Sequence, residues 1–130
     1  MEINWVWGNK LKMEEKENWK NKSIRISKDL QGYNLEYNFS SEDNFFYLNQ
    51  GTKTVENYEK LMKEIFNIFY DLKVYHGKIP ERVYLKTIEK NKKIKRAGKK
   101  IQIEPVEENI LKDLKKEINN KCGRLEVIIK

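Results

Sequence analysis

Residues 54–75, Thr-Val-Glu-Asn-Tyr-Glu-Lys-Leu-Met-Lys-Glu-Ile-Phe-Asn-Ile-Phe-Tyr-Asp-Leu-Lys-Val-Tyr, carry the strongest structural signal of this 130-residue chain. Their apolar side chains recur at spacings of three and four, the period of an amphipathic helix. These are Val55, Tyr58, Met62, Ile65, Phe66, Phe69 and Leu72, with Leu61 and Ile68 widening the stripe. Thr52 or Thr54 is suited to cap the start of the helix, and Gly77 to end it in a left-handed conformation. So wide an apolar face requires a sheet to cover.

The residues before this helix follow the two-residue period of β-strands. Tyr33, Leu35, Tyr37 and Phe39 alternate strictly with polar residues, which predicts the clearest strand of the chain. Shorter patterns predict strands at residues 3–7, 23–27 and 45–48, a turn at 49–51, and a loop or short helix at 9–22. We therefore expect an antiparallel meander with one buried face.

The chain after the helix resumes as strands around a second helix. Residues 82–86 and 101–104 predict the two strands of a β-hairpin with a long tip. Pro105 suits the first turn of the next helix, which Gly123 ends, and a strand at 124–129 closes the chain. Its apolar face comprises Val106, Ile110, Leu111, Leu114 and Ile118. A right-handed crossover through this helix predicts one parallel strand pair.

The predicted order is β-β-β-β-α-β-β-α-β, and the predicted fold class is α+β. We expect a mainly antiparallel twisted sheet with two helices packed on one face. The length fits a single domain over residues 1–130, with a protruding basic hairpin at about 86–100. The lone Cys122 cannot form an intramolecular disulfide, which fits the reducing cytoplasm. Neither a transmembrane helix nor a signal peptide is expected from the sequence.

The net charge of the chain is concentrated in residues 86–100. This segment carries eight basic residues and one acidic residue, whereas the other 115 residues carry 19 of each sign. A neutral body with one cationic segment is expected to attract a polyanion or an acidic protein surface. The candidate binding residues are Lys86, Lys90, Lys92, Lys93, Lys95, Arg96, Lys99 and Lys100.

A plainer explanation exists for the lysines. Lys, Asn and Ile together supply 51 of the 130 residues and Ala occurs once, as an AT-rich genome would produce. Lysine is then the default solubilising residue, and the segment is a solvated loop. The clustering of the charge, rather than the number of lysines, favours a binding role.

The side chains that usually carry catalysis or bind metal are sparse. His76 is the only histidine, and at a helix C-terminus it is expected to complement the helix dipole. Cys122 is expected to be a small buried residue, and one Cys with one His cannot form a zinc cage. The triplet Glu14-Glu15-Lys16 has the E-x-K pattern of metal-dependent nucleases, but charged residues are so frequent here that chance produces it. No phosphate-binding glycine motif occurs, so we expect no enzyme, metal or cofactor.

Aromatic residues admit two interpretations. Tyr33, Tyr37 and Phe39, with residues 45–47 beside them, could form a stacking platform for single-stranded bases. Their regular alternation is equally that of a core-facing strand, and the long helix needs such a face, so the core is favoured.

The sequence is compatible with four classes of function. The first is an inhibitor or modulator of a nucleic-acid-handling machine, such as a phage anti-CRISPR protein, acting through the cationic hairpin. The second is a direct DNA- or RNA-binding module of low specificity. An immunity or antitoxin protein and a small Lys-dependent ribonuclease are the further alternatives. None of them involves a membrane.

Overall fold

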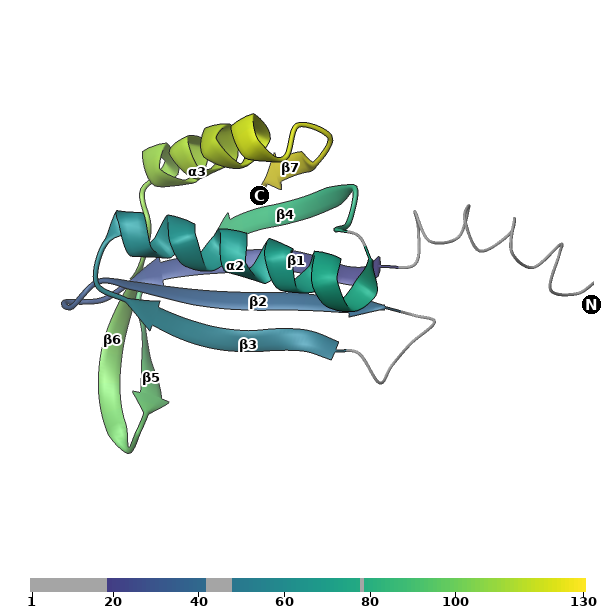
Figure 1. Cartoon of the computed structure of the whole chain (residues 1–130). Helices are drawn as coiled ribbons and strands as arrows, with labels where there is room; N and C mark the ends of the chain where they lie inside the picture. Colours follow the sequence, from purple (N-terminus) through teal and green to yellow (C-terminus); the bar gives the residue numbers. More distant parts are fainter. Residues whose placement is uncertain (1–18, 42–47, 78) are drawn as a thin grey trace, which may run out of the picture.

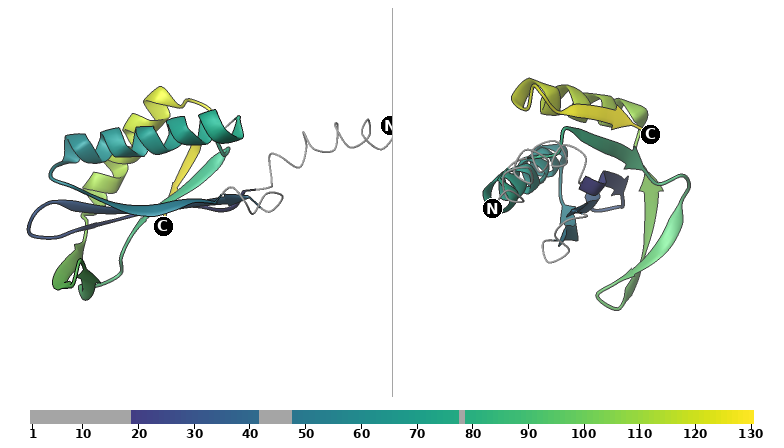
Figure 2. Two further views of the ribbon diagram at one scale, coloured as in Figure 1. Left: turned by 60° about the horizontal axis from the view of Figure 1, so that its bottom comes forward. Right: turned by 90° about the vertical axis from the view of Figure 1, so that its right-hand side faces the viewer.

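A mixed β-sheet carries two helices on one of its faces (Figure 1, Figure 2). The computed structural model describes residues 19–41, 48–77 and 79–130, and the predicted strand at residues 3–7 lies outside them. The fold class is α+β, as predicted. The elements are β1 (Trp19–Lys28), β2 (Tyr33–Ser41), β3 (Leu48–Val55), α2 (Tyr58–His76), β4 (Arg82–Thr87), β5 (Lys92–Arg96), β6 (Lys99–Pro105), α3 (Glu108–Lys121) and β7 (Glu126–Ile129).

The central path of the sheet has the strand order β3-β2-β1-β4-β7. Strands β1, β2 and β3 form an antiparallel meander, as predicted for this part of the chain, but β1 begins at Trp19, within the segment that was expected to be a loop or short helix. The parallel pair predicted across the second helix, between residues 101–104 and the last strand, is wrong: β7 pairs in parallel with β4 instead of β6, and a second parallel pair joins β1 to β4. The chain crosses over through α2 and then α3 while stepping in the same direction along the sheet. Crossovers of the same hand then leave both helices on the same face.

The core lies between this face and the helices. Phe39 of β2 and Phe69 of α2 meet edge to face, with ring centres 6.2 Å apart and planes at 70°. Phe39 is fully buried, and Tyr33 and Tyr37 pack against the same core, so this strand faces the core rather than offering a stacking platform. The strands contribute Ile24, Ile26, Leu35, Val83, Leu85 and Val127, and the helices contribute Leu61, Ile65, Ile68, Leu72, Leu111, Leu114 and Ile118.

Helix α2 begins four residues later than the apolar period predicted. Asn57 is its N-cap, and the side-chain Oδ1 accepts a hydrogen bond from the Lys60 amide at 2.9 Å. Thr52 and Thr54, the predicted caps, instead lie in β3, and residues 49–51 are strand rather than turn. Both predictions were wrong because residues 48–55 pair with β2 along their whole length. Within this pairing Gly51 lies opposite Tyr37, and its missing side chain leaves room for the tyrosine ring. Gly77 ends the helix at φ 81°, as predicted.

Replacing Asn57 with alanine is expected to destabilise the protein by about 1 kcal/mol, because the Lys60 amide loses its acceptor. Urea unfolding followed by circular dichroism measures this loss. Thr54→Ala is the control, since Thr54 is exposed in β3 and caps nothing. Equal losses in both variants would contradict the assignment of the cap.

The segment after β4 departs from the predicted hairpin over residues 82–104. Strand β4 pairs with β1 and β7, not with β6. Instead β5 and β6 form their own hairpin around Ala97-Gly98, whose φ angles of 51° and 79° match the left-handed turns that suit the twist of hairpins. Pro105 is the last residue of β6, so the prediction that it opens α3 is wrong.

Candidate polyanion-binding hairpin

The β5–β6 hairpin projects from the sheet on the side opposite the helices (Figure 2). Its base joins the sheet through β6, where Glu104 and Pro105 pair with Lys28 and Ser27 at the end of β1. Thr87 at the end of β4 accepts a hydrogen bond from the Val106 amide at 2.8 Å. This bond links the end of β4, where the chain leaves the central sheet, to the residue after β6, where the chain returns to it.

The strand register divides the side chains of the hairpin between two faces. Because successive residues alternate, Ile94, Ile101 and Ile103 share the inner face, where Ile103 is fully buried. Arg96 lies on this face too, with Lys92 and Lys99, both exposed. The outer face carries Lys93, Lys95, Lys100, Gln102 and Glu104, all exposed. We use "outer lysine face" for Lys93, Lys95 and Lys100.

Arg96 anchors the tip of the hairpin to the body. Its Nη1 donates a hydrogen bond to the Asn34 Oδ1 and lies 3.9 Å from the Asp29 Oδ2. Asp29 in turn accepts hydrogen bonds from the backbone amides of Gln31 and Gly32 through Oδ1, and from the side-chain Nδ2 of Asn34 through Oδ2. The guanidinium is therefore committed to the turn between β1 and β2. Its role in the hairpin is positioning.

The remaining candidate residues are placed around this anchor. Lys86 lies half-buried on β4, opposite Arg25 of β1, on the sheet face that the helices leave open. Lys90 is exposed in the bend before β5. The structure thus brings Lys93, Lys95 and Lys100 together, with Lys92 and Lys99 on the other side of the same ribbon. Lys86 and Lys90 lie outside this ribbon, because both precede the start of β5.

The outer lysine face is electrostatically costly. Lys95 lies directly opposite Lys100 in the register, and like charges in that position destabilise a strand pair. Among the residues that the structure describes, no carboxylate forms an ion pair with any of the seven candidate lysines. The positive potential of the segment is therefore left to act on the surroundings.

The residues considered for catalysis are placed as follows. Cys122 is partly buried beside α3, and this burial raises the pKa of its thiol, with Lys121 and Lys73 opposing the shift. The thiol is thus protonated at neutral pH, as befits a packing residue. His76 is the last residue of α2; the predicted interaction of its side chain with the helix dipole remains a prediction. The Glu14–Lys16 triplet lies outside the described residues.

Sequence reasoning missed the anchor of the hairpin. The turn at Gln31-Gly32 was recognisable, but the capture of Arg96 by Asp29 and Asn34 joins segments more than sixty residues apart. Asp followed three residues later by Gly was the available signal for a side chain that caps its own turn.

Within residues 19–41, 48–77 and 79–130, no group of three or more His, Cys, Asp or Glu residues is arranged to hold a metal ion. In the same part of the chain, neither helix is long and apolar enough to cross a membrane. Comparison of the chain with protein-family models, curated proteins and solved structures finds no match.

Proposed function

We propose that this chain is a binding protein that modulates a nucleic-acid-handling complex by docking its outer lysine face on the phosphate backbone held by that complex. The observation that carries the proposal is the segregation of Lys93, Lys95 and Lys100 on one exposed face, where no ion pair neutralises them. Keeping Lys95 opposite Lys100 lowers the stability of the hairpin, which an anionic partner would offset. An inhibitor of the anti-CRISPR kind would act through such a contact.

The chemistry of this face favours a phosphate backbone over base recognition. Lysine ammonium groups are compact point charges that bind phosphates without a preferred plane, whereas bidentate base contacts use Arg, Asn or Gln. Arg96, the only arginine of the hairpin, is held by Asn34 and Asp29, and the side-chain amide of Gln102 donates to the Ile103 carbonyl at 3.5 Å. Specificity would therefore come from the complex as a whole.

A direct DNA- or RNA-binding module is the second candidate, and the same face favours it. Gel shifts with mixed duplex DNA and RNA separate the two candidates. If the isolated chain binds duplex DNA through its three outer lysines, log K is expected to fall against log salt with a slope of about −2.7, at about −0.9 per phosphate neutralised. A shift with this slope supports the second candidate. No shift at low salt removes it.

The first candidate is tested by capture from the source cell, using the chain and a Lys93→Gln, Lys95→Gln, Lys100→Gln variant as baits. We expect a nucleic-acid-handling complex to be retained by the chain, to be lost with the variant, and to be released by nuclease treatment. Equal capture by both baits would refute the proposal and leave the lysines a solubilising role. A captured toxin that nuclease does not release would instead identify an immunity protein.

A further inference from the structure

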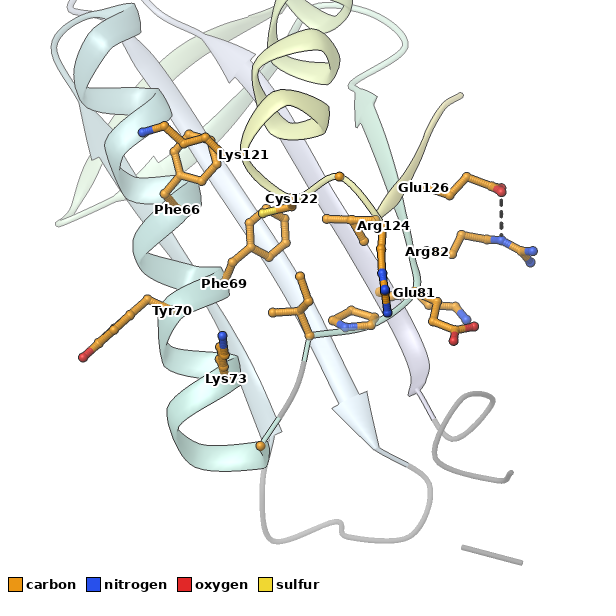
Figure 3. Close-up of a pocket in the computed structure, with 16 residues that line it drawn as sticks. Phe66, Phe69, Tyr70, Lys73, Glu81, Arg82, Lys121, Cys122, Arg124 and Glu126 are labelled. Atoms are coloured by element: carbon orange, nitrogen blue, oxygen red, sulfur yellow. Dashed lines mark ion pairs between the residues drawn. The ribbon is translucent and has the colours of Figure 1, made fainter. Parts of the chain in front are cut away.

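A groove of about 920 Å³ lies between the C-terminal halves of α2 and α3, on the helical side of the sheet (Figure 3). Its size is within the range of small-molecule and cofactor sites. Phe66 and Phe69 project into it from α2, and Cys122 faces them from the end of α3 (Figure 3). Further apolar lining comes from Ile79, Pro80 and Leu125. The hairpin projects from the opposite side of the sheet, so the two sites are separate.

Basic side chains dominate the rim of the groove. Five basic residues line it, Lys22, Lys73, Arg82, Lys121 and Arg124, against the two acidic residues Glu81 and Glu126. Arg82 and Glu126 neutralise one another as an ion pair at 3.3 Å. The groove thus keeps an excess of three positive charges, although the chain outside residues 86–100 is neutral overall.

Helix ends account for part of this charge. Lys121 lies in the last turn of α3 and Lys73 near the end of α2, where cations interact favourably with the helix dipole. Lys121 also lies over the Phe66 ring, 4.6 Å from its centre. Arg124 lies beyond α3, is exposed, and has no ion pair with any described carboxylate. Its charge is available to a ligand.

Apolar surface continues from the groove onto the outer side of α2. Tyr70 is 69% exposed and points away from the groove (Figure 3), and Val74, one helical turn on, is 56% exposed. Residues four apart lie on one side of a helix, so the two form a stripe beside the groove. A ligand that covers both the groove and this stripe has the dimensions of a peptide rather than of a small molecule.

We infer that this groove binds an amphipathic segment of a partner protein, with apolar side chains against the partly buried Phe66 and the exposed Tyr70 and carboxylates on Lys73 and Arg124. The excess positive charge of the rim selects acidic flanks, and the aromatic floor selects a helix-in-groove contact made by apolar anchors. The inference concerns a second site and does not depend on the nucleic-acid contact of the hairpin.

The test uses a fluorescein-labelled 15-residue helical peptide with Leu and Phe on one face and Glu on its flanks. Because any acidic peptide is attracted to the outer lysine face, the protein is the full chain with Lys93→Gln, Lys95→Gln and Lys100→Gln. Fluorescence anisotropy is expected to show saturable binding that Lys73→Glu with Arg124→Glu weakens at least tenfold. Tyr70→Ser with Val74→Ser is expected to weaken it as well.

Two controls decide whether the groove itself is responsible. Lys112→Glu with Lys116→Glu makes the same charge change at exposed positions of α3 that do not line the groove, and should leave the affinity unchanged. An equal loss in this variant, or equal binding of a peptide with the same residues in scattered order, would overturn the inference. Tighter binding after Trp5→Ala with Trp7→Ala would also overturn it, because the chain's own N-terminal residues would then be the occupant.

Discussion

Replacing Lys93, Lys95 and Lys100 with glutamine is expected to weaken nucleic-acid binding about a hundredfold near 0.15 M salt. Each lysine that neutralises a phosphate of duplex DNA contributes about 0.9 to the slope of log K against log salt, and three contribute about 2.7. Extrapolated from 1 M to 0.15 M salt, this slope corresponds to roughly two orders of magnitude in affinity. Salt titrations followed by fluorescence anisotropy measure both the affinity and the slope of log K against log salt. The chain alone is titrated against labelled duplex DNA, and a second titration uses the captured complex.

The same variant is expected to be slightly more stable than the natural chain. Lys95 and Lys100 repel one another across β5 and β6, and removing that repulsion contributes a few tenths of a kcal/mol. Lys112, Lys115 and Lys116 on α3 provide a matched control, because their replacement by glutamine removes the same charge elsewhere. Equal loss of binding in the two variants would mean that net charge, and not the outer lysine face, drives association.

Replacing Gly32 with alanine is expected to cost roughly 3 kcal/mol, by combining backbone strain with overpacking. Gly32 has φ 156° in the turn between β1 and β2. A methyl group there would overlap the carbonyl oxygen of Val55 and lie 2.9 Å from the Cα of Glu56. These are backbone atoms at the end of β3, so the strand pairing must shift. With a urea m-value of about 2 kcal/mol/M, the unfolding midpoint should fall by about 1.5 M.

Gly98→Ala is the control for this experiment. Gly98 also has a left-handed backbone, at φ 79°, but an added methyl group meets nothing within 4 Å. Its replacement is expected to cost about 1 kcal/mol from backbone strain alone. If Gly32→Ala proved no more costly than Gly98→Ala, the tight contact between the turn and β3 would be refuted.

The fold class was predictable because long periodic segments determine it. The stripe from Tyr58 to Leu72 and the alternation from Tyr33 to Phe39 each have one buried face, and both faces meet in the core. The predicted boundaries of helices and strands were wrong where pairing with another strand overrode the local sequence pattern. Val55 matches the helical period and Thr54 was expected to open the helix, yet they pair with Tyr33 and Asn34 at the end of β3. The second parallel pair, β1 with β4, depends on segments that lie far apart in the sequence.

The position of the basic segment was predictable from the sequence, but the division of its side chains between two faces was not. Counting residues located the basic segment at 86–100. Only the register of β5 with β6 separates Lys93, Lys95 and Lys100 from the inner isoleucines. Arg96 looked equivalent to its lysine neighbours, but its planar guanidinium is paired with Asn34 and Asp29.

Fastening the hairpin at both ends has a consequence for association kinetics. The Thr87–Val106 hydrogen bond holds the base, and the contacts of Arg96 hold the tip. A hairpin restrained in this way would lose little conformational entropy on binding the proposed partner. The ammonium groups of the outer lysine face would already be in position before the encounter. Electrostatic attraction would then raise the association rate, because a larger fraction of encounters would lead to binding. A loop of identical sequence without these two contacts would encounter the partner as often, but fewer of those encounters would yield a complex.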